Sequence, residues 1–165
     1  MAARSGLVAR RDQRLREIDL GRWQGLTARE AQQRFPVEFT AWRSGEDVAR
    51  GGGETYAEAG ARAAGCLLEL IDLMPAGRTA LAVTHGGTAR GALGVLLGLP
   101  VEHWWRLAPL GNACWSVLLE GERGWRLERH NAEVGGQLGP VAGAFDIGAA
   151  GLTGTAGSPD DDPVK

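Results

Sequence analysis

Residues 79–88 read Thr-Ala-Leu-Ala-Val-Thr-His-Gly-Gly-Thr, a short apolar run that ends in a histidine and two glycines. The run over 79–84 predicts a buried parallel strand, and the pattern over 88–97 predicts a helix. The junction therefore lies between the carboxyl end of a strand and the start of a helix. Ligands of open α/β sheets bind at this edge, so the stretch indicates an α/β fold with a site at His85.

The chemistry of this junction suits an anion. A helix N-terminus offers unpaired N–H groups and partial positive charge, which favour phosphate. Gly86 and Gly87 allow a ligand to approach the backbone closely, and the His85 side chain can hold or protonate a phosphoryl oxygen. A capping histidine in an ordinary tight turn is the alternative. The stretch is not a Walker A loop, because no Gly-Lys-Ser/Thr follows it.

Helices precede this stretch and a hairpin follows it. Two capping boxes, Thr27–Glu30 and Thr55–Glu58, predict helix starts. The predicted helices run from Thr27 to Phe35, from Pro36 to about Ser44-Gly45, and from Thr55 to about Leu73. Residues 113–119 and 125–129 predict two strands joined by a hairpin. Alternating helices and strands favour a layered α/β sheet.

Composition excludes several classes of protein. The 165 residues carry a net charge of −2, which excludes a strongly basic nucleic-acid binder. No apolar run is long enough for a signal peptide or a membrane span, and two cysteines make neither a disulfide scaffold nor a metal site. We therefore expect a cytoplasmic protein without nucleic acid, membrane, metal or cofactor. Oligomeric state cannot be read from the sequence.

The chain divides into two parts of different composition. Residues 1–131 have the pattern of one folded domain. The 34 residues of 132–165 hold eight glycines, three prolines and a run of three aspartates. Because so little apolar surface cannot offset the entropy of ordering, we predict a disordered tail there.

Two further stretches carry candidate residues. Charges alternate over residues 15–25, which is typical of a solvated segment with surface ion pairs, and Glu17 is one acid among several there. Residues 50–54, Arg-Gly-Gly-Gly-Glu, predict a flexible lead-in to the long helix, with an anion cradle as the alternative. Arg43 and Arg50 can reach a second anionic group such as a carboxylate, although solvated surface arginines are the simpler interpretation.

Taken in order, these segments resemble the histidine phosphatase superfamily, also called phosphoglycerate-mutase-like. The matching stretches are Leu15 to Thr27, Gly52 to Thr55, Thr84 to Gly87, Leu110 to Trp115 and Trp125 to Asn131. The branch that contains glucosyl-3-phosphoglycerate phosphatase is the most similar, because it carries a segment like Gly111-Asn112-Ala113-Cys114-Trp115. The resemblance implies a three-layer sandwich with a mostly parallel sheet that lacks the family's first strand and helix.

The resemblance also implies a function. It implies a phosphomonoester hydrolase that acts on a small phosphorylated metabolite, a sugar phosphate or a phosphoglycerate derivative, through a phosphohistidine. Glu17 matches the carboxylate that protonates the leaving alkoxide and then activates water. His85 matches the residue that helps to bind the phosphoryl oxygens, with the backbone of Gly86 nearby. Arg43 and Asn112 are the candidates for further substrate contacts.

One part of the family pattern has no match. The family begins with a strand ending in Arg-His-Gly, which supplies the nucleophile, and these 165 residues contain no such triplet. We expect the chain alone to be inactive, and to be unstable because the strands beside the absent one lose their hydrogen-bonding partner. The two explanations are a recorded start of the chain that lies too late in the gene, or a truncated gene. The alternatives are a remnant that binds a phosphorylated ligand or partner, a phosphoglycerate-mutase-type phosphotransferase, and an unrelated α/β nucleotide-binding domain. The absence of Gly-x-Gly-x-x-Gly and Walker A patterns argues against the last.

Overall fold

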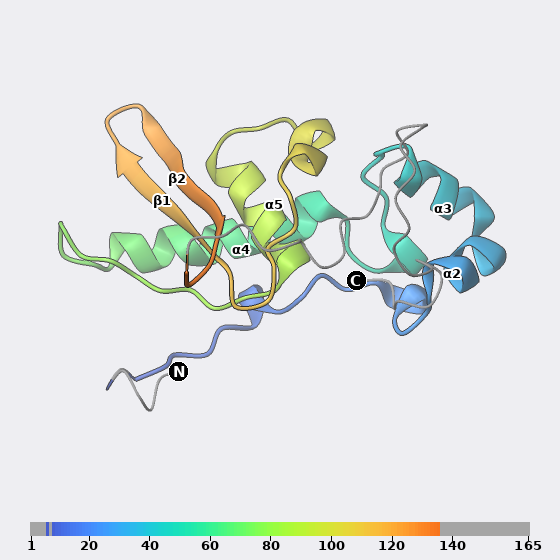
Figure 1. Ribbon diagram of the computed structural model, residues 1–165, viewed down its shortest axis with the longest axis horizontal. Coiled ribbons are helices and arrows are strands. Elements are labelled where there is room, and N and C mark those ends of the chain that lie inside the picture. Colours follow the sequence, from blue (N-terminus) through green and yellow to red (C-terminus); the bar gives the residue numbers. More distant parts are fainter. Residues whose placement is uncertain (1–5, 7, 136–165) are drawn as a thin grey trace.

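Helices make up most of the ordered secondary structure, with one hairpin of two strands (Figure 1). The structure is a computed structural model and describes residue 6 and residues 8–135. Its α-helices are α2 (Ala28–Arg34), α3 (Pro36–Arg43), α4 (Tyr56–Asp72) and α5 (Gly86–Leu96). Its strands are β1 (Trp115–Gly121) and β2 (Gly124–Ala132). Short 3-10 helices are η1 (Gln13–Leu15), η2 (Gly21–Trp23), η3 (Arg50–Gly52) and η4 (Val101–Arg106).

Both predicted capping boxes are present. The Thr27 hydroxyl accepts the Glu30 N–H at 3.2 Å, and the Glu30 carboxylate accepts the Thr27 N–H at 2.9 Å. Thr55 and Glu58 repeat these two bonds at 3.1 and 2.9 Å. Each side chain satisfies an N–H that the helix end leaves without a partner. Helices α2 and α4 therefore begin where the sequence predicts, and Pro36 opens α3.

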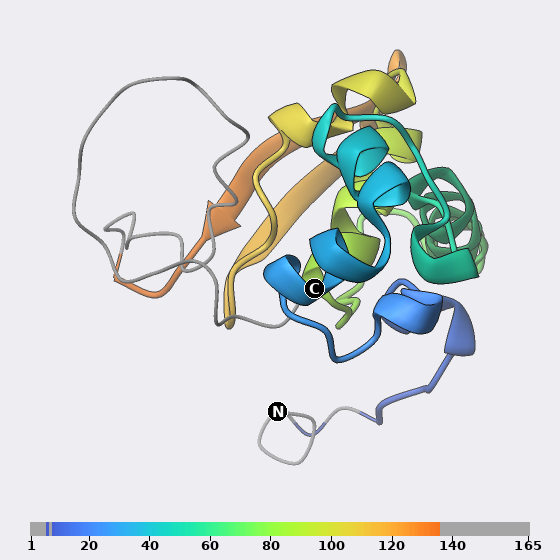
Figure 2. The ribbon, with the colours of Figure 1, turned by 90° about the vertical axis from the view of Figure 1, so that its right-hand side faces the viewer.

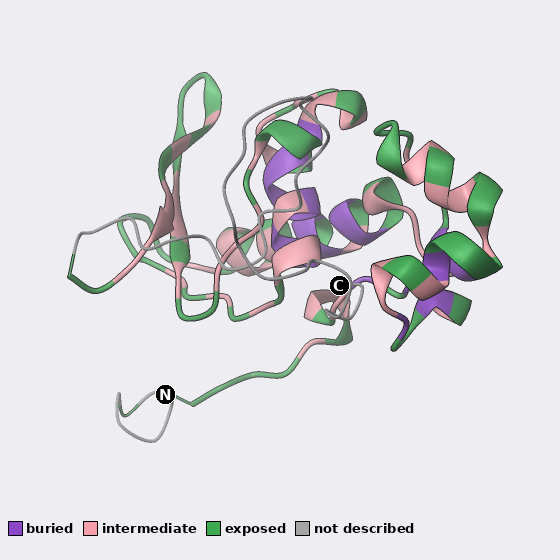
Figure 3. Ribbon diagram, turned by 45° about the vertical axis from the view of Figure 1, so that its right-hand side comes forward, coloured by how far each residue is buried: buried purple, intermediate pink, exposed green. Residues whose placement is uncertain are grey.

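Helices α4 and α5 pack closely in the centre of the molecule through two glycines. A Cβ on Gly60 would lie 2.7 Å from the Gly91 carbonyl oxygen, and a Cβ on Gly91 would lie 2.8 Å from the Gly60 Cα. Buried residues line this contact on both helices (Figure 3). Because neither residue has a side chain, the two helix backbones touch directly, and α4 holds α5 in place.

Gly60→Ala is expected to lower the free energy of unfolding by about 1–3 kcal/mol, because the new methyl group forces the helices apart. Gly65→Ala is the matched control on the same helix, since a Cβ there meets nothing within 4 Å. Its higher helix propensity should raise the free energy of unfolding by about 0.5–1 kcal/mol. Urea denaturation of both variants measures the difference. Equal changes in the free energy of unfolding for the two variants would contradict the close contact between α4 and α5 at Gly60.

A second buried cluster lies between α2, α3 and the charged stretch that the sequence predicts to be solvated. Trp23 is fully buried. Its ring lies 6.2, 5.9 and 5.8 Å from those of Phe35, Phe39 and Trp42. Aromatic pairs at such distances stabilise a fold beyond the area they bury. Ile18 is also buried in this cluster, so the charged stretch is anchored in the core, and a fully solvated segment is wrong.

The segment 79–84 has no regular secondary structure and is not the buried strand that its sequence predicts. Leu81 and Val83 are 69% and 70% exposed. No backbone hydrogen bond joins this segment to another described residue, although the Thr84 hydroxyl donates to the Leu15 carbonyl at 2.8 Å. A strand forms only where a neighbouring backbone pairs with its N–H and C=O groups. No segment of the described chain does so, and the prediction is therefore wrong there.

Strands β1 and β2 form an antiparallel hairpin (Figure 2). The register pairs Leu118 with Leu127 and Gly121 with Gly124. Compared with the prediction, β1 continues two residues further toward the turn, to Gly121, and β2 begins one residue earlier, at Gly124. Helices together with this sheet fit an α/β protein. The described residues do not form a three-layer sandwich with a mostly parallel sheet, which stays a prediction.

The predicted tail over 132–165 falls mostly outside the described residues. Its first residue, Ala132, ends β2, and residues 136–165 are not described. Among the helices that the structure describes, none is long and apolar enough to cross a membrane.

Candidate functional site

Helix α5 begins directly after His85, earlier than the sequence predicts. His85 is the N-cap residue with extended backbone angles, and its exposed side chain makes no capping hydrogen bond. Gly86 and Gly87 are therefore the first two helical residues. The N–H groups of a first helical turn have no partner within the helix, so they need acceptors from outside α5.

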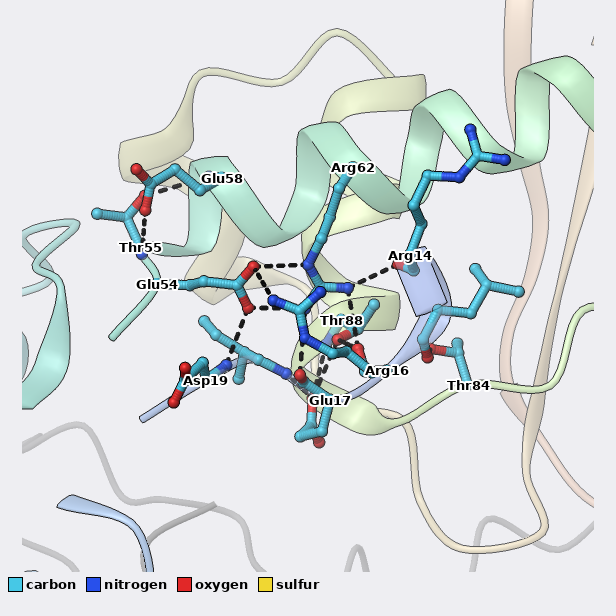
Figure 4. Close-up of polar contacts among 12 residues, drawn as sticks. Arg14, Arg16, Glu17, Asp19, Glu54, Thr55, Glu58, Arg62, Thr84 and Thr88 are labelled. Atoms are coloured by element: carbon cyan, nitrogen blue, oxygen red, sulfur yellow. Dashed lines mark hydrogen bonds and ion pairs between the residues drawn. The ribbon is translucent and has the colours of Figure 1, made fainter. Parts of the chain in front are cut away.

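The Glu17 carboxylate caps α5 in place of a His85 side chain (Figure 4). Its Oε1 accepts the Thr88 N–H at 3.1 Å and the Ile18 N–H at 2.9 Å. The buried Thr88 hydroxyl lies 3.2 Å from the same oxygen and donates to the Arg16 carbonyl at 2.7 Å. A carboxylate is favoured at the positive end of a helix. The structure thus brings Glu17 to the helical turn that follows His85.

An ion pair between Arg62 and Glu54 lies beside the Glu17 segment. Arg62 Nε donates to Glu54 Oε1 at 2.7 Å, and its Nη2 donates to Oε2 at 2.8 Å. Glu54 also accepts the Asp19 N–H and an Arg16 N–H, each at 2.9 Å. Bidentate pairs of this kind are stronger than neutral hydrogen bonds. The bonds from Arg62 foremost, then the Asp19 N–H and the Arg16 charge, lower the pKa of Glu54 to about 2.

This lowered pKa predicts a specific loss of stability in acid. Because the pKa of Glu54 is lower in the folded than in the unfolded chain, its contribution is fully present above about pH 5 and is lost toward pH 2. The free energy of unfolding of the wild type should fall by about 2–3 kcal/mol more than that of Glu54→Gln over this range. Urea titrations at several pH values measure the difference. The same pH dependence in both proteins would contradict it.

The glycine-rich loop before α4 does not form an anion cradle. The Gly51 N–H donates to Glu38 Oε2 at 2.8 Å, and the Glu54 N–H donates to the Asp19 carbonyl at 2.8 Å. A Cβ on Gly53 would collide with that Asp19 carbonyl oxygen, so glycine is what allows the two backbones to touch. With these N–H groups in use, the loop serves as the lead-in to α4, and the cradle alternative is wrong.

The other candidates are placed differently. A Cβ on Gly86 would lie 3.1 Å from the carbonyl oxygen of Leu110, in the loop that precedes β1. Asn112 is exposed two residues further along this loop. Glu17, Gly86 and the Asn112 loop thus gather at the N-terminus of α5, beside His85. Arg43 instead ends α3, and Figure 1 shows that helix in another part of the molecule.

Arg50 is not a solvated surface arginine. Its side chain is fully buried, with the guanidinium carbon 4.8 Å from the centre of the Tyr56 ring and 5.7 Å from that of Trp42. Its three guanidinium nitrogens find no hydrogen-bond partner among the described residues. Cation–π attraction of this kind is worth more away from water. Arg50 therefore belongs to the aromatic cluster under α3.

Sequence reasoning missed Thr88 and Arg62 as site residues. Thr88 lies inside the glycine motif, where its hydroxyl has no special signal. Arg62 follows Glu54 by eight residues, and it bonds the Glu17 carbonyl across 45 residues of chain. Neither spacing is a local pattern, so only the folded structure shows the connection.

Comparison with profiles of known protein families assigns the chain that carries this site to one family. The profile of the histidine phosphatase superfamily (branch 1) matches residues 1–133. The chain belongs to the histidine phosphatase superfamily. The resemblance drawn from the sequence motifs is thereby confirmed.

Several relatives of this histidine phosphatase chain are named for their substrates. It is 36% identical to glucosyl-3-phosphoglycerate phosphatase of Mycobacterium tuberculosis over 150 residues, which is 81% of this chain and 67% of that protein. The protein of that name from Mycolicibacterium vanbaalenii is 37% identical over 148 residues, with shares of 79% and 66%. A solved mycobacterial glucosyl-3-phosphoglycerate phosphatase with inorganic phosphate is 37% identical, with a TM-score of 0.71 over 80% of this chain and 69% of that one. The chain thus spans about two thirds of the length of these relatives.

Proposed function

We propose that this chain supplies the proton donor and the phosphoryl-binding group of a site that hydrolyses phosphomonoesters. The substrate class is a small phosphorylated metabolite, a sugar phosphate or a phosphoglycerate derivative. One observation carries the proposal: the Glu17 carboxylate lies at the N-terminus of α5, in the turn that follows His85. The names of the relatives support the substrate class. The domain that carries the site is proposed to be residues 1–131.

The two side chains suit two different tasks. Oε1 of Glu17 is held by N–H groups, and Oε2 accepts no hydrogen bond from another described residue. The second oxygen can therefore protonate a leaving alkoxide and later take a proton from water. The His85 imidazole and the N–H groups of Gly86 and Gly87 can stabilise negative charge on the phosphoryl oxygens. Asn112 is proposed as a further substrate contact. Arg43 ends α3 in another part of the molecule, so it is proposed to contact a second anionic group only in a substrate that extends from α5 to α3.

A phosphohistidine forms on a nucleophilic histidine, which the family carries in an Arg-His-Gly triplet. No histidine in these 165 residues stands in such a triplet. Of the three histidines, His130 is held in β2, where its ring nitrogens lie 2.9 Å from the Ser116 hydroxyl and 2.8 Å from the Ala108 carbonyl. His103 lies in η4, and neither matches the Arg-His-Gly pattern. We therefore propose that the 165-residue chain by itself binds phosphate without turnover. The three-layer sandwich with a mostly parallel sheet is proposed from the family alone, because residues 79–84 have no paired backbone among the described residues.

A paired assay tests this function. Protein isolated from its own cells, with its intact mass measured, is compared with the recombinant 165-residue chain on glucosyl-3-phosphoglycerate, 3-phosphoglycerate and phosphoserine. Release of inorganic phosphate by the isolated protein supports the proposal. Transfer of the phosphoryl group without release would instead support the mutase alternative. No hydrolysis by either protein would refute the proposal, and phosphate binding without hydrolysis would then favour the non-catalytic remnant that binds a phosphorylated ligand.

A further inference from the structure

The residues that hold Glu17 in place form a separate unit behind the site. We propose that Arg62 is a positioning residue, which holds the Glu17 carboxylate at the N-terminus of α5 through its ion pair with Glu54 and through the backbone of residues 14–19. The inference rests on the proposed function only for the role of Glu17 in catalysis. The contacts that carry it are independent of that role.

Every N–H donor of the Arg62 guanidinium is used. Two of its five N–H groups bond Glu54, as described above. Nη1 donates to the carbonyl oxygens of Arg14 at 2.6 Å and of Arg16 at 3.0 Å, and Nη2 donates to that of Glu17 at 3.1 Å. Arg62 thus spans three carbonyl groups of the segment that carries Glu17 (Figure 4).

Glu54 completes the hold from the other side. Its two oxygens accept four hydrogen bonds, two of them from Arg62 and one from the Asp19 N–H. The Asp19 carbonyl in turn accepts the Glu54 N–H. The backbone is therefore fixed on both sides of Glu17, before it at Arg14 and Arg16 and after it at Asp19.

Arg62 and Glu54 restrain the position of the Glu17 carboxylate without contacting it. The Glu17 Oε1 contacts are to Ile18 and Thr88, and none of the Arg62 hydrogen bonds reaches the Glu17 carboxylate or the start of α5. Arg62 itself lies on α4, which packs against α5 through Gly60 and Gly91. One closely packed helix pair therefore carries both the residue that fixes the Glu17 backbone and the helix end that the Glu17 carboxylate caps. A displacement of about 1 Å in a reacting group is enough to cost orders of magnitude in rate.

The side chain must be an arginine for this role. A lysine keeps the charge beside Glu54, but its single ammonium has three donors and no planar fork. It cannot reach the carboxylate and three carbonyls together. Arg62→Lys therefore separates the ion pair from the hold on the backbone, and Arg62→Gln removes both.

Amide hydrogen exchange in the protein isolated from its own cells tests the contact directly. In Arg62→Gln and Arg62→Lys the amides of Thr88 and Ile18 should exchange at least about tenfold faster, relative to the amide of Leu93 in the buried face of α5. Arg14→Gln is the matched control, because its side chain pairs only with Asp12 and Glu69 among the described residues. It should leave both amides protected. If Arg62→Gln does not fold, Arg62→Lys alone gives the result.

Kinetics on the enzyme isolated from its own cells provide a second measurement. Arg62→Lys should lower kcat about tenfold or more and leave KM within about twofold, because Arg62 does not contact the substrate. Exchange at Thr88 and Ile18 that changes only as much as at Leu93, or a change in KM alone, would overturn the proposal. If the isolated protein hydrolyses no phosphomonoester while the exchange result holds, the proposed function fails and the positioning of Glu17 stands.

Discussion

In the protein isolated from its own cells, Glu17→Gln is expected to lower kcat for a sugar phosphate about 10²–10⁴-fold in steady-state kinetics, the usual range for loss of a general acid. The amide oxygen of glutamine can still accept the N–H groups of Thr88 and Ile18, so the cap on α5 is retained. It has no acidic proton to give to the leaving alkoxide. Only the lost negative charge at the helix N-terminus affects the fold, at about 0.3–1 kcal/mol.

The leaving group and a second variant make this prediction specific. An aryl phosphate needs less help from an acid than a sugar phosphate, so the loss of kcat should be smaller on p-nitrophenyl phosphate. Glu17→Ala removes the cap as well and should cost a further 0.5–2 kcal/mol in the free energy of unfolding, roughly the value of an N-cap. Near-normal turnover of both substrates by Glu17→Gln would leave Glu17 as a capping residue only.

Helix boundaries were predictable because the chemistry that fixes them is local. Thr27 and Glu30, and then Thr55 and Glu58, lie three residues apart, and their reciprocal bonds need nothing from the rest of the chain. The N-terminus of α5 was less predictable, because its cap is supplied by Glu17 from 71 residues away. A sequence pattern around His85 contains no trace of that distant carboxylate.

The strand over 79–84 shows the opposite limit. Its apolar run has the right composition, but a strand is a property of two backbones, and a sequence window contains only one. With no paired neighbour in the described chain, Leu81 and Val83 remain exposed. The same reasoning applies to Glu54 and Arg62, whose contacts with the Glu17 segment form only when that distant segment lies against them.

His85→Ala is expected to weaken the binding of inorganic phosphate by the 165-residue chain about 10–100-fold, the effect of losing one hydrogen bond to a charged group. The N–H groups at the start of α5 remain, so some affinity should persist. In the isolated enzyme the same variant should lower kcat by about 10²–10³-fold, because charge on the phosphoryl oxygens grows in the transition state. Isothermal titration calorimetry and steady-state kinetics measure the two effects.

If His85 served only the fold, His85→Ala would lower the free energy of unfolding and leave the affinity for phosphate unchanged. Its side chain is exposed and makes no capping bond, so its removal should change the free energy of unfolding by less than about 0.5 kcal/mol. His103→Ala, in η4, is the control for the loss of any histidine and should bind phosphate as the wild type does. Reduced affinity with unchanged stability therefore reports on the anion itself. Wild-type affinity in His85→Ala would mean that the helix N–H groups alone hold phosphate, and His85 would leave the proposed site.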